Sequence, residues 1–173
     1  FSFGVYVAAP VAAETGWLSL FPVAPTLFEV GGAMPLEARL RDLGGDVFGM
    51  AADISQPASI DAFFAAVDKT FGRIDILVNN AGTSKRGPFL QMTDEDWAGD
   101  MELKVYGAIR CSRVAIPHMK KQGGGRIINL STIGGKQPAA TSMPTSVSRA
   151  AGLALTKALS KELAGDNILV NAV

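Results

Sequence analysis

Apolar positions follow a helical period most clearly in the segment 57–71. Four large apolar residues recur there at the spacing of one helical face: Ile60, Phe63, Phe64 and Val67. Pro57 stands in the first turn, where its missing N–H is not needed, and Gly72 follows as a residue that ends helices well. The pattern predicts an amphipathic helix over 57–71 that stops at Gly72.

Short apolar runs, typical of buried strands, lie on both sides of this helix. We expect strands at four places: residues 47–52, 74–78, 126–131 and 167–173. Two longer amphipathic segments, 93–119 and 144–163, predict helices. Thr93 and Asp96 form a capping pattern at the start of the first of them. Strands and helices therefore alternate along the chain.

The two longer helices are expected to present different kinds of face, and the first is expected to bury its bulky residues. The helix over 93–119 offers bulky residues: Trp97, Met101, Val105, Ile109 and Val114. The helix over 144–163 offers a broad, smooth face: Ala150, Ala151, Ala154, Leu155, Ala158 and Leu159. Alternating strands and helices imply right-handed crossovers and a parallel sheet covered on both faces. The sequence therefore predicts a doubly wound α/β fold in one domain, residues 1–173.

The first 46 residues carry a weaker pattern than the rest. Residues 3–9 and 18–23 are interpreted as short strands, and 35–43 as a short helix that a pair of glycines stops. Proline and glycine interrupt this region, and it has no long helical period. We expect an irregular N-terminal part before the regular part, residues 47–173.

Charge and composition exclude several classes of function. The 16 basic and 16 acidic side chains balance without forming blocks, so neither nucleic acid nor a membrane surface is an expected partner. The apolar N-terminal region lacks the basic start of a signal peptide, and prolines interrupt it, so we expect no membrane span. One cysteine and one histidine form no metal-ligand cluster. We expect a soluble, cytoplasmic protein without a metal site.

The single cysteine and the single histidine are both interpreted as structural. Cys111 lies in an amphipathic run and is expected to be a small core residue instead of a reactive thiol. His118 lies near a helix end, where we expect a surface or capping group, because no partner that would make it a base is identifiable.

Hydroxyl groups and a cation gather in the stretch 126–149. Ser131 and Thr132 follow an expected strand, and Thr145 and Arg149 lie about one helical turn apart at the start of the next helix. Open α/β sheets place their ligands at the carboxyl ends of strands. The stretch therefore predicts the frame of an active site.

Five motifs follow one another in the second part of the chain. They are ADI at 52–54, LVNNAG at 77–82, GRIINLS at 125–131, SRAAGLALTKAL at 148–159 and the closing run at 167–173. From about residue 44 onward the chain resembles the short-chain dehydrogenase/reductase family of NAD(P)-dependent oxidoreductases. The resemblance implies a Rossmann-like fold and hydride transfer between a nicotinamide and a small alcohol or carbonyl substrate.

The same resemblance implies a binding site for NAD or NADP. The sequence does not discriminate between these two cofactors. Asp53, with Ile54 beside it, would meet the adenine, and the backbone of Asn80, Ala81 and Gly82 would line the adenosine ribose. A carboxylate accepts hydrogen bonds from an amine, and glycine lets a main chain approach a cofactor closely. The alternative for the asparagine segment is a strand-end turn whose side chains satisfy backbone groups.

Two further expectations follow from the resemblance. The helices at 93–119 and 144–163 would form the face of a homodimer or homotetramer. Family members also begin with a strand and a Thr-Gly-rich turn that faces the pyrophosphate. The nearest candidate here, residues 15–22, has bulky residues where small ones are required, and the glycine pair at 31–32 is a weaker candidate.

The expected catalytic set departs from the family pattern. Counting along the motifs, the family's tyrosine falls on Thr145, its lysine on Arg149, its serine on Thr132 or Ser131, and its helix asparagine on Lys104. A phenol with a pKa of about 10 becomes a useful donor beside an ammonium group, whereas an aliphatic hydroxyl is a far weaker acid and a guanidinium keeps its proton. We expect ribose binding by Arg149 to survive and turnover to be weak or absent.

Lys104 would supply an acid if burial lowered its pKa, but we interpret it as a solvated helix lysine. Tyr106 points about 200° around the helix from it and is not a substitute. Three hypotheses remain open. The chain is an NAD(P)-linked oxidoreductase, a non-catalytic nucleotide-binding or dimerising scaffold, or an incomplete chain that ends before the family's substrate loop, lid helix and last strand.

Overall fold

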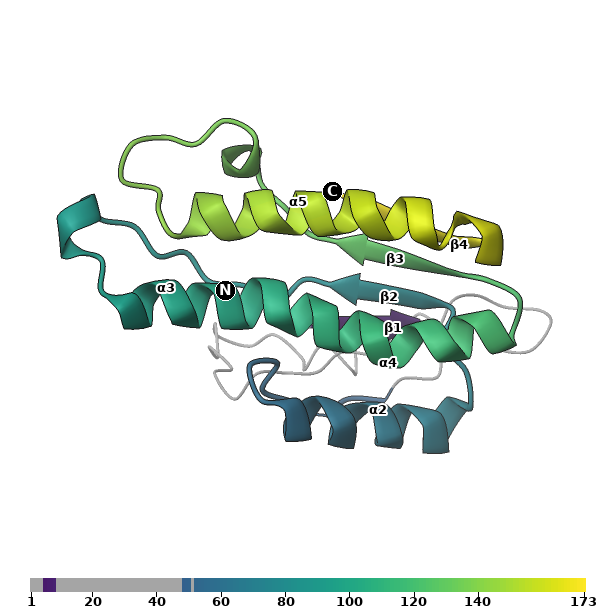
Figure 1. Ribbon diagram of the computed structural model, residues 1–173. Helices are drawn as coiled ribbons and strands as arrows, with labels where there is room; N and C mark the ends of the chain where they lie inside the picture. The colour runs from purple at the N-terminus through teal and green to yellow at the C-terminus, as the bar shows by residue number, and fades with distance from the viewer. Residues whose placement is uncertain (1–4, 9–47, 51) are drawn as a thin grey trace, which may run out of the picture.

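The computed structural model describes residues 5–8, 48–50 and 52–173, and Figure 1 shows their arrangement. Four strands form one sheet in the order β1, β2, β3, β4. Their bounds are Val5–Ala8 for β1, Ile76–Asn79 for β2, Gly125–Asn129 for β3 and Ile168–Ala172 for β4. Strands β2, β3 and β4 are parallel, as the alternation of strands and helices predicts.

Strand β1 runs antiparallel to β2, with Val5 opposite Asn79 and Ala8 opposite Ile76. Strand β1 lies within residues 3–9, where the sequence predicts a strand. Its antiparallel direction differs from the parallel direction that the alternation of strands and helices predicts. An antiparallel neighbour satisfies the backbone N–H and C=O groups along the edge of β2 just as a parallel one would. At residues 47–52, the described positions carry an isolated β-bridge at Gly49 and no strand.

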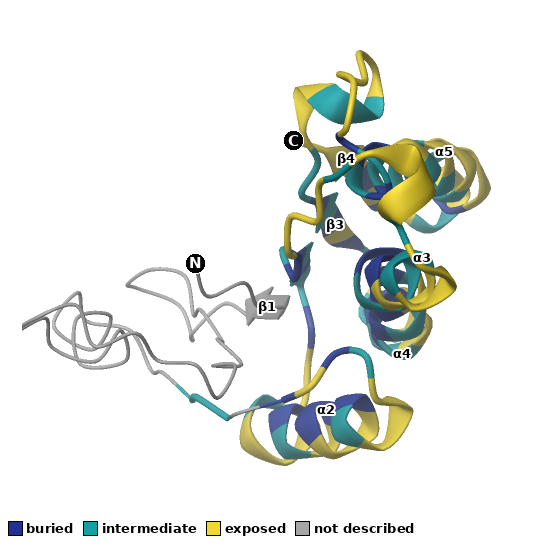
Figure 2. Ribbon diagram, turned by 90° about the vertical axis from the view of Figure 1, so that its left-hand side faces the viewer, coloured by how far each residue is buried: buried dark blue, intermediate teal, exposed yellow. Residues whose placement is uncertain are grey.

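The long helices form one layer beside the sheet (Figures 1 and 2). They are α2 at Pro57–Phe71, α3 at Asp94–Met101, α4 at Gly107–Lys121 and α5 at Thr145–Glu162. Within this layer α4 lies between α5 and α2. Helices on a second face, which the sequence also predicts, have no counterpart among the described residues. Short 3-10 turns complete the described elements: η1 at Phe89–Gln91, η3 at Ile133–Gly135 and η4 at Ala164–Asp166.

Helix α2 agrees closely with its sequence pattern. All four residues of its predicted apolar face are buried, and Gly72 ends the helix in the left-handed conformation with φ of 66°. Glycine adopts this conformation without the steric conflict that a Cβ brings, and its N–H bonds back to the carbonyl of Asp68 at 2.8 Å. The core continues from α2 into the strands through Leu77, Ile127 and Ile168.

Helices α3 and α4 are joined by η2, Glu102–Tyr106, a turn with π-helical hydrogen bonds. Together the three cover the single helix predicted over 93–119. Among the bulky residues expected on its buried face, only Val105 is fully buried. Small residues lie against the sheet in their place: Ala108, Cys111, Ser112 and Ala115. A helix with small side chains approaches a sheet closely, so bulk alone does not identify the buried face.

The broad, smooth face expected on α5 is only partly buried in the chain. Ala150, Ala154 and Ala158 are exposed, whereas Ser146, Ser148 and Thr156 are buried. These hydroxyls have partners inside the molecule, so burial does not leave them unsatisfied. The interpretation of Cys111 as a core residue is confirmed, since it is 0% exposed. His118 is half-buried in the last turn of α4, with Nδ1 3.6 Å from Asp68.

Several sequence predictions lie outside the described residues. They concern the strand at 18–23, the helix at 35–43, and the turn candidates at 15–22 and 31–32. Among the helices that the structure does describe, none combines the length and the apolar character that crossing a bilayer requires.

Candidate active site

An open cleft of about 780 Å³ lies where strands β2 and β3 end. Residues from three segments line it, and they include Ser131, Thr132, Thr145 and Arg149, the four that the sequence places in an active-site frame. Asn80 lines the same cleft from the segment after β2. The structure therefore brings these residues together where the strands end.

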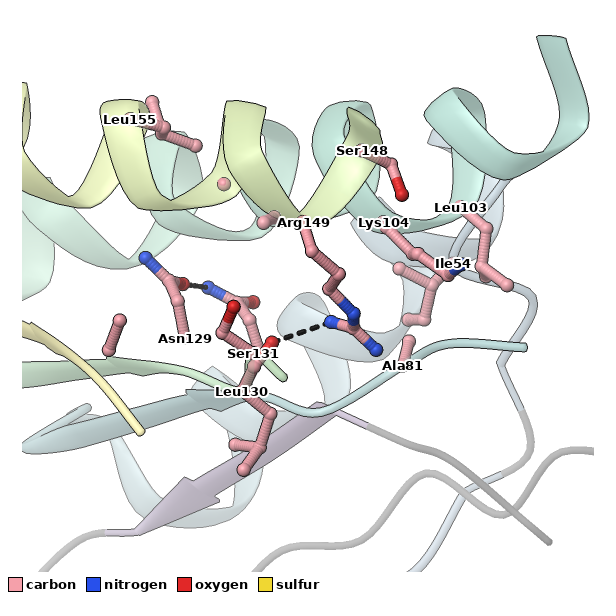
Figure 3. A pocket seen from close by; sticks show the side chains of 14 residues that line it. Ile54, Ala81, Leu103, Lys104, Asn129, Leu130, Ser131, Ser148, Arg149 and Leu155 are labelled. Atoms are coloured by element: carbon pink, nitrogen blue, oxygen red, sulfur yellow. Dashed lines mark hydrogen bonds between the residues drawn. The ribbon is translucent and has the colours of Figure 1, made fainter. Parts of the chain in front are cut away.

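Arg149 reaches from α5 toward the segment after β3 (Figure 3). Its Nη1 donates to the carbonyl oxygen of Leu130 at 2.5 Å. Its Nε is buried and has no hydrogen-bond partner among the described residues. Burial lowers the pKa of the guanidinium, and the charge of Asp100 opposes that shift. Arg149 thus brings a cation and an unused donor to the cleft.

Gly82 is required by the position of Arg149. A Cβ built at Gly82 would lie 2.6 Å from Arg149 Nη2 and 3.6 Å from Lys104 Cε. Any larger residue would push the guanidinium out of its place, because the first of these distances is shorter than a van der Waals contact. Gly82 therefore lets the segment after β2 pass close to the side chains of Arg149 and Lys104.

Lys104 is buried, which corrects its interpretation as a solvated helix lysine. Its Nζ lies 2.5 Å from Asp100 Oδ1, and the two side chains are 1% and 2% exposed. The ammonium also donates to Thr145 Oγ1 at 3.2 Å. Burial lowers the pKa of Lys104, the hydrogen bond and charge of Asp100 oppose this, and the charge of Arg149 adds to the lowering. Lys104 and its neighbour Val105 lie in the π-helical turn η2, and both are buried.

Asp100 is a site residue that the sequence reasoning missed. Its Oδ1 accepts from Lys104, and its Oδ2 accepts from Ser148 Oγ at 2.5 Å. Ser148 also donates to the carbonyl oxygen of Thr145 at 2.9 Å. Asp100 and Lys104 lie four residues apart on a predicted helix, and side chains at this spacing face each other. This spacing is the feature of the sequence that indicates an ion pair. Without the fold, however, nothing indicates that the pair faces inward.

Thr145 connects this ion pair to the cleft. Its Oγ1 accepts from Lys104 Nζ and from the backbone N–H of Lys85 at 3.1 Å, and it donates to the Lys85 carbonyl at 3.2 Å. Thr145 also lines the cleft, so the residue that contacts the buried ammonium lies at the edge of the open space. The helix start at Thr145 and its spacing from Arg149 agree with the sequence prediction.

A small inner cavity of about 20 Å³ lies behind the cleft (Figure 3). Three buried polar atoms without a partner among the described residues belong to residues that line it: Asn79 Oδ1, Ser131 Oγ and Arg149 Nε. A volume of this size holds about one water molecule, and such a water needs 2–4 polar partners. The cavity therefore provides room for a water that would satisfy atoms which the protein leaves unpaired.

The residues predicted to bind a cofactor's adenosine half lie along the same edge. Ile54 and Ala81 line the inner cavity together with Lys104 and Arg149. Asp53 is exposed at the start of α2, where its Oδ1 accepts from the backbone N–H and the hydroxyl of Ser55. Such a carboxylate has a structural role in the turn, and it keeps its second oxygen for another donor.

The comparison with known families agrees with the fold. The sequence model of the short chain dehydrogenase family matches residues 30–173. The chain belongs to this family, and its fold is a Rossmann-like α/β fold. Within the described residues, no group of three or more histidine, cysteine or acidic side chains is arranged to hold a metal ion.

Individual relatives are oxidoreductases. The uncharacterized oxidoreductase YvrD of Bacillus subtilis is 37% identical over 75% of this chain and 49% of its own length. The 3-oxoacyl-(acyl-carrier-protein) reductase FabG of Vibrio cholerae is 34% identical over 76% of this chain and 54% of its own length. The chain spans about half the length of the curated relatives it matches.

Solved structures show the same relationship. L-sorbose reductase from Gluconobacter frateurii, crystallised with NADPH and L-sorbose, superposes with a TM-score of 0.74 at 37% identity, over 76% of this chain and 50% of that one. NAD+-bound xylitol dehydrogenase superposes with a TM-score of 0.75 at 29% identity, over 79% of this chain and 53% of that one.

Proposed function

We propose that this chain is an NAD(P)-dependent oxidoreductase that transfers hydride between a nicotinamide and a small alcohol or carbonyl compound. The convergence of Ser131, Thr132, Thr145 and Arg149 on one cleft is the observation that carries this proposal. The relatives support it, because they are named as oxidoreductases and carbonyl reductases. When bound, the nicotinamide would supply or accept the hydride.

The residues present fit such a cofactor. Arg149 has a buried Nε without a partner among the described residues, and it lies beside Gly82, where no Cβ blocks close approach. We propose that Arg149 donates to a ribose hydroxyl and that Asn80, Ala81 and Gly82 line the adenosine ribose. Asp53 and Ile54 would lie on the adenine side. The choice between NAD and NADP is left to measurement.

The roles of the reacting groups follow from their chemistry. Ser131 and Thr132 carry hydroxyls that would orient a carbonyl oxygen in the cleft. Thr145 presents its hydroxyl to the same space, but an aliphatic hydroxyl alone is too weak an acid to protonate an alkoxide near neutral pH. Turnover would therefore be weak unless another group supplies the proton.

A non-catalytic scaffold is the second candidate, and one observation favours it. Two of the expected catalytic positions are already bonded to backbone, Thr145 to Lys85 and Arg149 to Leu130. These bonds stabilise the loops around the cleft without any reaction. We further propose that residues 1–173 form one domain, that α4 and α5 provide a surface for a homodimer or homotetramer, and that the protein works in the cytoplasm.

Fluorescence titration with NADH and NADPH separates the two candidates. The oxidoreductase is expected to bind one of them with a micromolar Kd, corresponding to about −8 kcal/mol, and to oxidise it when ethyl acetoacetate, a small 3-oxo ester, is added. The scaffold would bind the nucleotide without oxidising it. Failure to bind either nucleotide would contradict both. The matched control is Gly82→Val, which should weaken binding because its side chain displaces Arg149.

A further inference from the structure

A residue that lines the cleft carries a hydroxyl in contact with a buried ammonium group, whereas the family pattern has an asparagine and a tyrosine at these two positions. Thr145 Oγ1 lies 3.2 Å from Lys104 Nζ, and Thr145 is one of the residues that line the cleft. Lys104 in turn lies 2.5 Å from Asp100, whose other oxygen accepts from Ser148. Four side chains from the helix layer therefore form one chain of hydrogen bonds that ends at the cleft.

We propose that Lys104 supplies the proton of the reaction through the hydroxyl of Thr145, with Asp100 as the residue that positions Lys104. The inference rests on the proposed oxidoreductase function and deepens it, because it names the proton source that the aligned tyrosine position lacks. Thr145 is the catalytic residue of this relay, since it would touch the substrate, whereas Lys104 would act through it.

The proton balance closes without a further reactant. A bound reduced nicotinamide would supply a hydride to the substrate carbonyl carbon, and the electron pair of the C=O bond would pass to oxygen. That oxygen would take the hydroxyl proton of Thr145, and Thr145 Oγ1 would take a proton from Lys104 Nζ in the same step. Lys104 would be left as a neutral amine and, because it is buried and does not line the cleft, would recover its proton through the Thr145 hydroxyl after the product leaves. Asp100 remains a carboxylate throughout.

The acid strength of this relay matches that of the group it replaces. A lysine ammonium has an ordinary pKa of about 10.4 and a phenol one of about 10, so either is a comparable donor to an alkoxide. Thr145 never becomes an alkoxide, because it gains one proton as it loses another. Its weak acidity, which made turnover doubtful from sequence, is therefore no obstacle. Burial also lowers the pKa of Lys104 and so favours release of the proton.

The hydrogen-bonding capacity of Thr145 suits the relay. A hydroxyl has two acceptor sites and one hydrogen. Lys104 Nζ and the N–H of Lys85 donate to the two acceptor sites of Thr145 Oγ1. The hydroxyl hydrogen is therefore the part of the group that can bond to a substrate. It points to the Lys85 carbonyl over 3.2 Å, longer than the usual 2.7–2.8 Å or so for a bond between oxygens. A substrate oxygen in the cleft would compete well for it.

The position of Lys104 is held from both neighbouring helices. The charged groups that face it are Asp100 from α3 and Arg149 from α5. Asp100 keeps the ammonium aimed at Thr145, and Ser148 fixes the carboxylate through its second oxygen. A buried ion pair adds little stability compared with apolar residues of the same volume, so its presence beside a cleft fits a role in chemistry.

The decisive variants are Thr145→Val and Thr145→Ser, assayed with ethyl acetoacetate and the nucleotide that binds. Valine keeps the shape and removes the hydroxyl, so kcat should fall by about 100-fold or more, the usual contribution of a positioned acid, with little change in nucleotide Kd. Serine restores the hydroxyl and should recover most of that loss. Equal kcat values for wild type and Thr145→Val would overturn the relay.

The pH profile tests Lys104 itself. Because reduction needs the ammonium form, kcat should fall as the pH rises through the pKa of Lys104. In Lys104→Met, kcat should be much lower at every pH and should no longer show this fall. Lys120→Met is the matched control, since Lys120 lies on the same run of helix in an exposed pair with Asp166. If Lys104→Met fails to fold, Asp100→Asn with Lys104→Gln removes both charges and keeps hydrogen bonding. A fall in kcat that persists without Lys104 contradicts the proposal.

A third measurement needs neither cofactor nor turnover. With ¹³C-labelled lysine, the NMR signal that is missing from Lys104→Met should titrate at a lower pH than the other lysines, and Thr145→Val should shift it. If Thr145→Val leaves the Lys104 signal unchanged, the two groups are not in contact and the relay is overturned. If the wild-type chain binds no nucleotide, the oxidoreductase proposal as a whole is wrong. If the wild type is active and Thr145→Val has the same activity, only the relay is wrong.

Discussion

Asp100 and Lys104 illustrate at the scale of single residues how burial changes the meaning of a charge. On a surface, such a pair contributes at most about 1 kcal/mol and says little about function. Here both side chains are almost fully buried, so removing either partner alone leaves an uncompensated charge and costs about 3–5 kcal/mol. The local sequence does not show whether such a pair lies on the surface or inside. The interpretation of Lys104 as a solvated lysine was wrong for this reason.

Cys111 is expected to be unreactive in the folded chain. Its side chain is 0% exposed, and burial raises the pKa of the thiol from 9.0 to about 12, so almost no thiolate is present near neutral pH. Ellman's reagent should label it only after denaturation. Because the folded-state pKa is the higher one, this group's stabilising effect is complete below pH 9.0 and is lost as the pH rises toward 12. Rapid labelling of the native chain would contradict the buried position.

At the scale of elements, the clearest local signals were those of helix ends. Pro57 and Gly72 define α2, and Thr93 with Asp96 defines the start of α3, because caps depend on neighbours in the sequence. Which face a helix buries depends instead on what it packs against. For the helix over 93–119 the sequence predicted a bulky buried face, whereas mainly small residues of α4 lie inside. The cleft residues were found because strand ends can be recognised from motifs.

The cap of α3 provides a test at this scale. Thr93 Oγ1 accepts from Asp96 N, and Asp96 Oδ2 accepts from Thr93 N, both at 3.2 Å. Thr93→Ala removes half of this box and should lower the free energy of unfolding by about 1 kcal/mol, as measured by urea denaturation. Thr93→Ser keeps the hydroxyl and should lose much less. Indistinguishable alanine and serine variants would show that the cap does not hold the helix.

At the scale of the whole molecule, one buried hydrogen-bond network joins the sheet to the helix layer. Asn79 Nδ2 donates to Asn129 Oδ1 at 2.8 Å, and Asn129 Nδ2 donates to Thr156 Oγ1 at 2.9 Å. Thr156 continues to the carbonyl oxygen of Gly152 within α5. The network therefore links β2 through β3 to α5 directly beneath the cleft. Strand pattern alone does not predict it, because the partners lie far apart in the sequence.

Asn129→Ala should destabilise the fold by about 2–4 kcal/mol, because it leaves buried groups of both Asn79 and Thr156 without their partner and each costs about 1–3 kcal/mol. Thermal and urea unfolding would measure the loss. Asn171→Ala is the matched control, since Asn171 is exposed on the neighbouring strand β4 and should change stability by less than about 0.5 kcal/mol. Equal effects of the two variants would mean that the network contributes nothing.

The π-helical turn over Glu102–Tyr106 links the chemistry of the cleft edge to the length of one helix. The turn contains the buried neighbours Lys104 and Val105 and joins α3, which carries Asp100, to α4. Deleting one residue there would rotate Asp100 relative to α4 and separate it from Ser148. A change in the length of this helix would therefore remove the ion pair at the edge of the cleft as well.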